Sequence, residues 1–351
     1  MKEKVLLGMS GGVDSSVAAA ILIDEGYEVL GLHFSLTGEK EDLSDVKAVA
    51  EKLNIPLTVK DFSSVFKREV FDPFISSYKS GKTPNICVEC NKQIKFGEAF
   101  LVADELKCDF VATGHYCEII DLYGHFYLKK GTDKDKDQSY FLNGVTEEKL
   151  KRVLFPLAKL KKEEVREIAE KRGLKTAHKK GSSDVCLAGE RNFKDFLRDY
   201  IPPNPGKIIS ETGEVVGKHD GLFSYTLGQR KGLNLGGKKG EEGGRWFVVD
   251  KKSDENVLVV SHGSEDSLFT DTVFVEDFCF INGFPSEKSF RCTAKTRYRE
   301  PDTPATVFVD GNKVKVVFDE QKRAVTPGQY CVLYRSGGEL SGTVIGGGRI
   351  V

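Results

Sequence analysis

The sequence predicts an α/β chain: a parallel sheet covered by helices in the N-terminal part, followed by a β-rich second half. Apolar strand patterns alternate with helical periodicity up to Gly173. A turn-forming stretch at residues 201–206 (IPPNPG) then marks a linker. From Val273 onward, short alternating segments flank a hairpin turn.

In the first part, strands and helices follow one another. The strands are expected at residues 5–9, 29–34, 57–59 and 110–113. The helices are expected at residues 15–25, 43–53, 99–106 and 161–172. Ligands bind at the carboxyl ends of parallel strands. We therefore expect the turn after the first strand and Gly114-His115-Tyr116 after the fourth to face one crevice.

The second half reads as β-structure. Residues 207–209 and 215–216 flank a turn, and residues 305–309 and 313–318 flank Asp310-Gly311, a hairpin signal. We divide the chain into residues 1–205, an α/β catalytic domain, residues 206–272, a small central β-rich domain, and residues 273–351, a C-terminal β domain.

Composition limits the possible functions. The chain has 351 residues, 39% of them hydrophobic, which allows a sizeable core and two or three domains. A net charge of −1 gives no global signal for nucleic acid, so such contacts must rest on local patches. With no targeting segment and no apolar run that could span a membrane, a cytoplasmic protein is expected. Its eight cysteines are then not expected to form structural disulfides.

The turn after the first strand reads Ser10-Gly11-Gly12-Val13-Asp14-Ser15-Ser16 and precedes a helix. Adjacent glycines let backbone N–H groups approach an anion, and the helix start adds its positive dipole end. No Gly-Lys-Ser/Thr follows, so the turn is not a Walker A loop. It resembles the loop of enzymes that split ATP into AMP and pyrophosphate; the alternative is a chance glycine-rich turn.

Two segments carry cysteines in polar surroundings. Cys87 and Cys90 have the spacing of redox pairs and half metal sites, and Lys92 and Lys95 are placed to favour a thiolate. No second Cys-x-x-Cys completes a local zinc site, and two unrelated thiols are the alternative. Cys186 lies in a polar stretch of its own. The other cysteines lie in apolar surroundings and are interpreted as core or indifferent residues: Cys108, Cys117, Cys279, Cys292 and Cys331.

Eight segments in order resemble the bacterial tRNA-specific 2-thiouridylase family of pyrophosphate-loop ATPases, over nearly the whole chain. They are residues 10–16, 83–96, 112–116, 136–142, 182–186, 225–232, 295–299 and 324–329. The resemblance implies a Rossmann-like parallel sheet of the adenine nucleotide alpha-hydrolase type in the first domain and a β-barrel-like C-terminal domain. It also implies ATP and Mg²⁺ as cofactors and tRNA as partner.

The resemblance also implies roles for individual residues. ATP would be bound by Gly8, Met9, Ser10, Gly11, Gly12, Val13, Asp14, Ser15, Phe34 and Gly114. The anticodon region of tRNA would be contacted by Asn85, Ile86, Cys87, His115, Lys136, Asp137, Gln138, Arg297, Tyr298 and Gln329. Lys, Arg and Gln reach phosphates and sugars, and Tyr stacks on bases. From the residues alone, His115 is equally a capped turn histidine and the basic residues are solvated surface charges.

The implied chemistry follows from the substrate. The 2-oxo group of the wobble uridine is a poor leaving group, so ATP would adenylate it, with Mg²⁺ neutralising the phosphates. A persulfide on Cys186 would deliver sulfur, and Cys90 would attack it and leave a Cys90–Cys186 disulfide. The sulfur would come from a persulfide carrier or a cysteine desulfurase. Alternatively, Cys87, Cys90 and Cys186 would hold an iron–sulfur cluster with one open iron that carries sulfide.

Three positions vary against the family pattern: Ile86 replaces a frequent proline, Phe34 replaces a methionine, and Cys87 is an aspartate in other members. A different class of function also remains, a non-catalytic tRNA-binding module with a degenerate ATP loop. GMP synthetase, argininosuccinate synthetase and tRNA-lysidine synthetase share the loop, but none of them explains the two cysteine segments.

Overall fold

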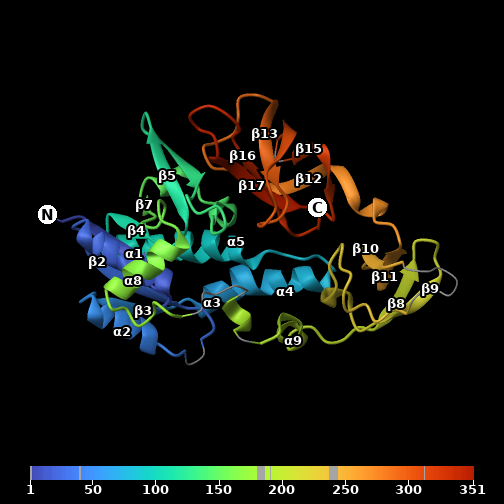
Figure 1. Cartoon of the computed structure of the whole chain (residues 1–351), viewed down its shortest axis with the longest axis horizontal. Helices are drawn as coiled ribbons and strands as arrows, with labels where there is room; N and C mark the ends of the chain where they lie inside the picture. The colour runs from blue at the N-terminus through green and yellow to red at the C-terminus, as the bar shows by residue number, and fades with distance from the viewer. Residues whose placement is uncertain (1, 39–40, 180–185, 190, 237–243, 312) are drawn as a thin grey trace.

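The computed structural model describes residues 2–351 except 39–40, 180–185, 190, 237–243 and 312. Three parts follow in chain order: an α/β domain, a small four-stranded sheet and a closed β-barrel (Figure 1). The barrel lies beside the helices that extend from the α/β domain, and the small sheet lies at their far end. Within the described ranges, no helix has the length and apolarity needed to cross a membrane.

The N-terminal sheet is parallel throughout, as predicted, in the order β3-β2-β1-β4-β7. Its strands are β1 Lys4–Gly8, β2 Glu28–Ser35, β3 Leu57–Asp61, β4 Phe110–Ala112 and β7 Val153–Leu154. Val5 and Leu7 are buried on one face and Leu6 on the other, which explains the uninterrupted apolar run of β1.

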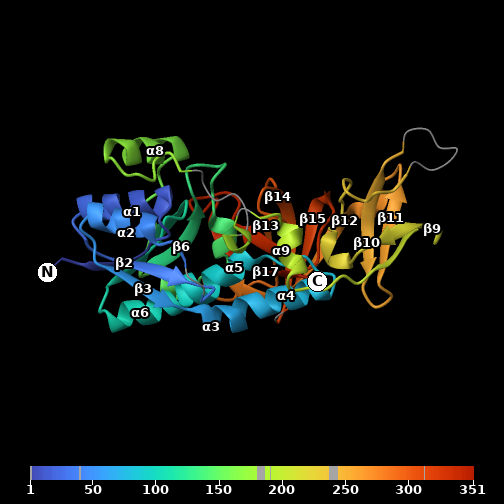
Figure 2. The same cartoon turned by 90° about the horizontal axis from the view of Figure 1, so that it is seen from below.

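Helices cover both faces of this sheet. Figure 2 shows α1, α2 and α8 on one face and α6 on the other. Their bounds are α1 Val13–Asp24, α2 Ser44–Lys52, α8 Lys162–Lys171 and α6 Ala99–Glu105. All four were predicted, because each has a clear apolar stripe or a glycine stop signal. The N–H of Lys161 donates to Glu164 at 2.7 Å and fixes the start of α8.

Two helical stretches that the sequence did not predict extend from the domain toward the small sheet (Figure 1). The first consists of α3 Ser63–Phe66, the π-helical η1 Lys67–Phe71 and α4 Asp72–Lys79. The second consists of α5 Ile86–Cys90 and the π-helical η2 Asn91–Glu98, which runs into α6. Cys87 and Cys90, the two cysteines of the first predicted segment, therefore lie on one helix, whereas Cys186 lies in η4.

Shorter elements complete the α/β domain. They are β5 Cys117–Leu122 and β6 His125–Lys130, which form a hairpin, η3 Ser139–Leu142, α7 Glu147–Leu150, η4 Cys186–Ala188 and α9 Phe193–Arg198. The small sheet has the order β10-β11-β8-β9. Its strands are β8 Gly206–Ser210, β9 Val215–His219, β10 Trp246–Lys252 and β11 Val257–His262, with the short helices η5 Leu222–Ser224 and η6 Asp266–Leu268 beside them.

The last part is a closed six-stranded barrel in the order β12-β15-β14-β13-β16-β17. Its strands are β12 Phe269–Phe280, β13 Ser289–Lys295, β14 Thr303–Asp310, β15 Lys313–Arg323, β16 Tyr330–Tyr334 and β17 Val344–Ile350. The predicted hairpin is confirmed by the pairing of Asp310 with Lys313. Alternate residues such as Val307 and Val316 fill the interior, as the period-two pattern requires.

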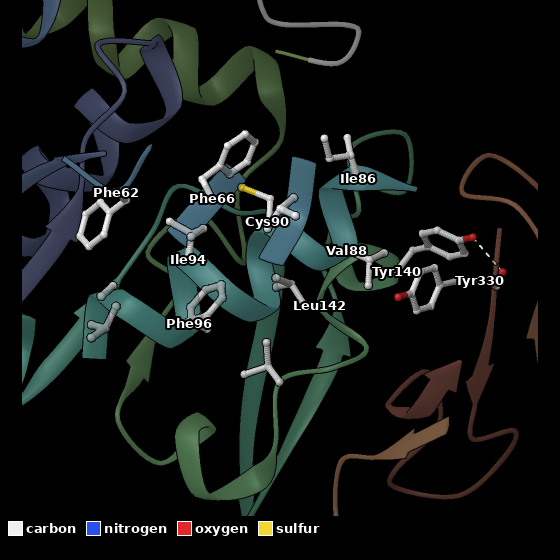
Figure 3. Close-up of a cluster of buried hydrophobic side chains, with 14 of the residues drawn as sticks. Phe62, Phe66, Ile86, Val88, Cys90, Ile94, Phe96, Tyr140, Leu142 and Tyr330 are labelled. Atoms are coloured by element: carbon white, nitrogen blue, oxygen red, sulfur yellow. Dashed lines mark hydrogen bonds between the residues drawn. The ribbon is translucent and has the colours of Figure 1, made fainter. Parts of the chain in front are cut away.

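The barrel shares a core with the helix that carries Cys90. Val332 and Tyr334 of β16 belong to the same buried cluster as Ile94. The Tyr140 hydroxyl donates to the Tyr330 carbonyl at 2.9 Å, and Figure 3 shows these two rings side by side at the barrel end of the cluster. The α/β domain and the barrel thus fold against each other across an apolar interface.

Candidate active site

The phosphate loop joins β1 to α1 and is fixed by its own side chains. The hydroxyls of Ser15 and Ser16 donate to the Gly12 carbonyl at 3.2 and 2.8 Å. The Gly12 N–H donates to the Ser10 hydroxyl at 3.3 Å. These bonds hold the turn at the N-terminus of α1, where free N–H groups and the helix dipole favour an anion.

Two glycines are required here by close packing. Gly11 has a φ of +73°, and a Cβ on it would lie 2.9 Å from the backbone nitrogen of Val46. A Cβ on Gly114 would lie 2.9 Å from backbone atoms of both Asp14 and Ser15. The end of β4 therefore lies directly against the loop. This confirms the prediction that the two strand ends face one crevice.

Asp14 is the anionic centre of this crevice. Its Oδ1 accepts the hydroxyl of Tyr116 at 2.6 Å and the ammonium of Lys162 at 2.6 Å. The Lys162 side chain is only 15% exposed. The sequence predicts Tyr116 beside the phosphate loop, but it does not reveal Lys162, which is 148 residues from Asp14. The result is a paired carboxylate and ammonium beside the phosphate loop.

We expect Lys162 to move from Asp14 to the phosphates when a nucleotide binds, because the ammonium is then attracted by several negative oxygens. Lys162→Met should therefore lower kcat/KM for ATP-dependent pyrophosphate release by about ten- to a hundredfold. Lys161→Met is the matched control, since Lys161 is exposed and its cap uses only backbone N–H. Equal pyrophosphate release by the two variants would contradict this assignment.

Phe34 lies where the resemblance places the adenosine contact. It ends β2, next to the loop, and a Cβ on Gly8 would lie 3.0 Å from the edge of its ring. The ring is half-buried and packs on Phe62 with centroids 5.6 Å apart. The position thus presents a fixed aromatic ring beside the phosphate loop, and its contact with adenosine stays a prediction.

His115 is buried in an aromatic box rather than exposed. Its Nδ1 lies 2.6 Å from the Thr113 hydroxyl, and its ring packs against Phe96 and Phe155 with centroids 6.0 and 6.1 Å apart. Burial, together with the nearby Lys95 charge, holds the pKa of His115 well below its ordinary value. His115 is therefore neutral and links the end of β4 to the helix η2; its predicted contact with tRNA is not tested by this geometry.

The helix of the reactive cysteines begins at Asn85. The Asn85 Oδ1 accepts N–H groups of Cys87 and Val88 at 3.2 and 3.4 Å, which is an N-cap. Cys87 is half-buried and Cys90 is 9% exposed. Figure 3 shows the Cys90 side chain among apolar groups, beside Phe66.

Burial dominates the acidity of both thiols. It raises the pKa of Cys87 and raises that of Cys90 to about 12, while the Lys95 ammonium lowers both. The prediction that Lys92 and Lys95 favour a thiolate is therefore only partly met: Lys95 acts on Cys90, but burial outweighs it. Lys92 acts on Cys279 instead.

Cys186 is far from Cys87 and Cys90 in the sequence, yet it acts electrostatically on both thiols. A charge on Cys186 raises the pKa of both Cys87 and Cys90, so the three sulfurs lie within electrostatic reach. Cys186 is exposed, and all eight cysteines are free. The predicted polar segment 182–185 before it lies outside the described residues.

The barrel loop at residues 327–329 forms hydrogen bonds with Thr83, just before helix α5, which carries Cys87 and Cys90. The Gln329 amide donates to the Thr83 carbonyl at 2.7 Å, and the Thr83 N–H donates to Pro327 at 2.9 Å. The Tyr330 hydroxyl donates to the Glu89 carboxylate. Gln329, predicted to contact tRNA, is thus already engaged in positioning this helix from 246 residues away.

The other predicted tRNA residues divide by exposure. Lys136 is exposed, whereas the buried Asp137 accepts N–H groups of Gly131 and Ser139 at 3.2 and 3.1 Å. Gln138 Oε1 accepts the Tyr116 N–H at 3.1 Å.

On the barrel side, Arg297 donates to the Ala324 carbonyl and to the Thr326 hydroxyl at 2.6 and 2.7 Å. Tyr298 packs on Phe141 with ring centroids 4.4 Å apart. Arg297 and Tyr298 are therefore engaged in contacts within the protein, while Lys136 and Arg299 are exposed.

Comparisons with known proteins cover the whole arrangement. Three family profiles match in order: a tRNA methyl transferase HUP domain over residues 3–190, a tRNA methyl transferase PRC-barrel domain over 194–262 and an aminomethyltransferase beta-barrel domain over 270–350. The chain is 45% identical over 354 residues to the tRNA-specific 2-thiouridylase MnmA of Streptococcus agalactiae serotype III (strain NEM316), covering 97% of this chain and 95% of that protein. The chain belongs to the tRNA-specific 2-thiouridylase family.

A second 2-thiouridylase, that of Psychromonas ingrahamii, is 44% identical over 97% of this chain and 96% of its own length. Among solved structures, a 4-thiouridine synthetase–RNA complex with bound ATP matches with a TM-score of 0.36 and 18% identity, over 57% of this chain and 50% of that one. The family assignment rests on the full-length relatives. It agrees with the resemblance that the eight segments carry.

A metal ion can be tested against the side chains of this 2-thiouridylase. Asp14 is the one acidic residue of the loop from 8 to 16. Mg²⁺ is usually held by one or two carboxylates plus substrate phosphates, so Asp14 fits a magnesium ion carried in with ATP. Among the described residues, no three His, Cys, Asp or Glu side chains form a metal-holding group. Cys87, Cys90 and Cys186 thus do not form such a group in the described part of the chain, and we derive no step through an iron–sulfur cluster.

The remaining cysteines of the 2-thiouridylase mostly follow the prediction. Cys108, Cys117, Cys292 and Cys331 are buried. Cys279 is half-buried and lines a cavity of about 240 Å³ together with Lys92. The residues that line this cavity include Glu89 and Arg349 and none from the phosphate loop.

Proposed function

We propose that this tRNA 2-thiouridylase uses ATP to adenylate the 2-oxo group of the wobble uridine and then transfers sulfur to that carbon from a cysteine persulfide. The observation that carries the proposal is that Cys186 lies within electrostatic reach of Cys90, on a domain whose phosphate loop is intact. Methyl transfer, which two of the family profiles name, would give neither the loop nor the paired thiols a role.

The first step is assigned to the loop. Residues 8–15 would hold the phosphates, with Gly114 leaving room for the nucleotide and Phe34 beside its base. Bound Mg²⁺ would supply charge neutralisation, with Asp14 as its protein ligand. The uridine oxygen attacks the α-phosphorus, pyrophosphate leaves, and the oxygen becomes part of an AMP leaving group.

The second step is assigned to the cysteines. The terminal sulfur of a Cys186 persulfide forms a bond to the uridine carbon, and AMP leaves with the oxygen. The Cys90 thiolate then attacks Sγ of Cys186, and the sulfur–sulfur bond breaks with its electron pair going to the uridine sulfur. This gives 2-thiouridine and a Cys90–Cys186 disulfide, which an external thiol must reduce. A persulfide carrier or cysteine desulfurase supplies the sulfur.

The test is a reconstituted reaction. The full chain, a tRNA transcript with a wobble uridine, Mg²⁺-ATP and a cysteine desulfurase with cysteine are expected to yield 2-thiouridine and AMP in equal amounts. Nucleoside mass spectrometry measures the product. Methylated uridine, or AMP without thiolation in the presence of persulfide, would contradict the proposal.

We further propose that tRNA crosses from the α/β domain to the barrel, with Lys136 and Arg299 as exposed contacts. Each charge reversal, Lys136→Glu or Arg299→Glu, should weaken tRNA binding about three- to tenfold and lower the salt slope by about one. Lys313→Glu, on the exposed turn of the hairpin between β14 and β15, is the control. Point variants are preferred to truncation near Pro205. Removing the barrel would expose the apolar residues of the α/β domain, such as Ile94, that share a core with Val332 of the barrel. Unchanged tRNA affinity in a variant that carries both Lys136→Glu and Arg299→Glu would refute the contact of tRNA with both domains.

A further inference from the structure

The cysteine helix changes its winding immediately after Cys90. Residues Asn91–Glu98 form a π-helical stretch in which the N–H of Ala99 donates to the carbonyl of Ile94, five residues earlier. The stretch contains a kink at Phe96, with φ −125° and ψ 16°. Such stretches inside α-helices frequently mark functional sites.

Neighbouring groups maintain this winding. A Cβ on Gly97 would lie 3.0 Å from the carbonyl oxygen of Lys92, so a glycine fits there with least strain. The Lys149 ammonium donates to the Phe96 carbonyl at the kink. The Phe96 ring packs in the His115 box. The irregular winding is thus braced from three directions, as a local feature with a structural role would be.

The π-helical winding of η2 determines which lysine lies on the same side of the helix as the cysteines. In an α-helix, two residues five apart lie roughly 140° apart around the helix axis. In a π-helix, where each N–H bonds to the carbonyl five residues earlier, two such residues lie within roughly 50° of each other. Cys90 and Lys95 are five apart, and Lys95 acts on Cys87, Cys90 and His115. Lys92 points elsewhere: a Cβ on Gly144 would lie 3.2 Å from its Cδ, and it lines the cavity with Cys279.

Among the residues that the structure describes, no acidic side chain is one of the groups that act on Cys90. These groups are Lys95, Cys87 and Cys186. On the neighbouring helix η1, Lys67 and Arg68 are paired with Asp72 and Glu69. On α5 itself, Glu89 accepts the Tyr330 hydroxyl. Lys95 is therefore the cation that faces the thiols without a carboxylate acting between them.

We propose that Lys95 is a positioning residue for sulfur transfer, turned toward the cysteines by the π-helical stretch, and that its ammonium attracts and stabilises the anionic sulfur that reacts at Cys90. The proposal rests on the assignment of Cys90 as a reacting thiol. An anionic group that approaches Cys90 from solution should be favoured over a neutral one of the same size, because the Lys95 ammonium attracts its negative charge.

Alkylation of the full chain tests this without ATP or tRNA. Iodoacetate is anionic and iodoacetamide is neutral, and tandem mass spectrometry reports the rate of each at Cys90. Lys95→Met should lower the ratio of the iodoacetate rate to the iodoacetamide rate about three- to tenfold, and Lys95→Arg should restore it. Lys92→Met is the matched control, and its ratio should equal that of the unaltered chain. A merely structural role for Lys95 would change both rates and leave their ratio unchanged.

A second measurement uses the unaltered chain, so the test does not depend on how the variants fold. Raising the ionic strength from about 10 mM to about 1 M should lower the ratio at Cys90 toward that of an exposed thiol in a peptide. A ratio that is the same in Lys95→Met and in the unaltered chain, or that is insensitive to salt, would overturn the proposal. If the ratio behaves as expected but no 2-thiouridine forms in the reconstituted reaction, the proposed function fails and the role of Lys95 at the thiol stands.

Discussion

Cys90→Ser and Cys186→Ser are each expected to lower 2-thiouridine formation by on the order of a thousandfold or more, while ATP and tRNA binding are unchanged. A serine at position 186 cannot carry a persulfide. A serine at position 90 cannot act as the thiolate that attacks the persulfide, so neither variant can complete the transfer. Cys87→Ser should lower 2-thiouridine formation much less, because the Cys87 sulfur forms and breaks no bond in the proposed mechanism.

The measurement is single-turnover thiolation with the full chain and a preformed persulfide donor. Cys279→Ser is the control, since Cys279 is also half-buried and lies beside a lysine. Near-normal turnover by Cys90→Ser would remove it from the mechanism. Complete loss of activity in Cys87→Ser, together with bound iron in the unaltered protein, would favour a cluster over the persulfide route.

The double variant Asp14→Ala, Ser15→Ala should abolish ATP-dependent activation. Ser15 links the Ser10 and Gly12 ends of the turn, and Asp14 is the carboxylate that Tyr116 and Lys162 hold. Without them the loop loses its fixed shape and its ligand for Mg²⁺, so AMP release should fall by on the order of a thousandfold.

Isothermal titration with ATP and a coupled pyrophosphate assay measure this effect. Circular dichroism should show an unchanged fold, because both residues lie in the first turn of α1 and neither belongs to the apolar core beside the sheet. Ser16→Ala is a milder control that removes one bond to the same Gly12 carbonyl. Unchanged ATP affinity and AMP release in the double variant would show that the loop does not hold the phosphates.

The sequence predicts those parts of the fold that depend on local signals. The strand–SGGVDSS–helix unit is identifiable because apolar run, glycines and helix start are adjacent. The meeting of Gly114 with Asp14 follows from parallel strand order, since strand ends on one edge share a crevice. The hairpin at Asp310-Gly311 is predicted for the same local reason.

Other parts depend on tertiary contacts that no local pattern reveals. Lys92 is closer to Cys90 in sequence than Lys95 is, yet Lys95 acts on Cys90 and Lys92 acts on Cys279, and the π-helical winding of η2 separates their roles. Gln329 resembles a surface contact, yet the fold brings it to Thr83. The pairing of Lys162 with Asp14 likewise requires α8 to lie on α1. These contacts come from helix packing and domain docking, which are decided by the whole core.

The most direct test of the account is to look for the bond that the transfer must leave behind. After one turnover with persulfide-loaded protein, ATP and tRNA in the absence of reductant, the chain is alkylated under acid conditions, digested and analysed by mass spectrometry. The account predicts a disulfide between Cys90 and Cys186, formed in proportion to 2-thiouridine and absent when ATP is omitted. Thiolation that proceeds with both cysteines recovered as free thiols would contradict it.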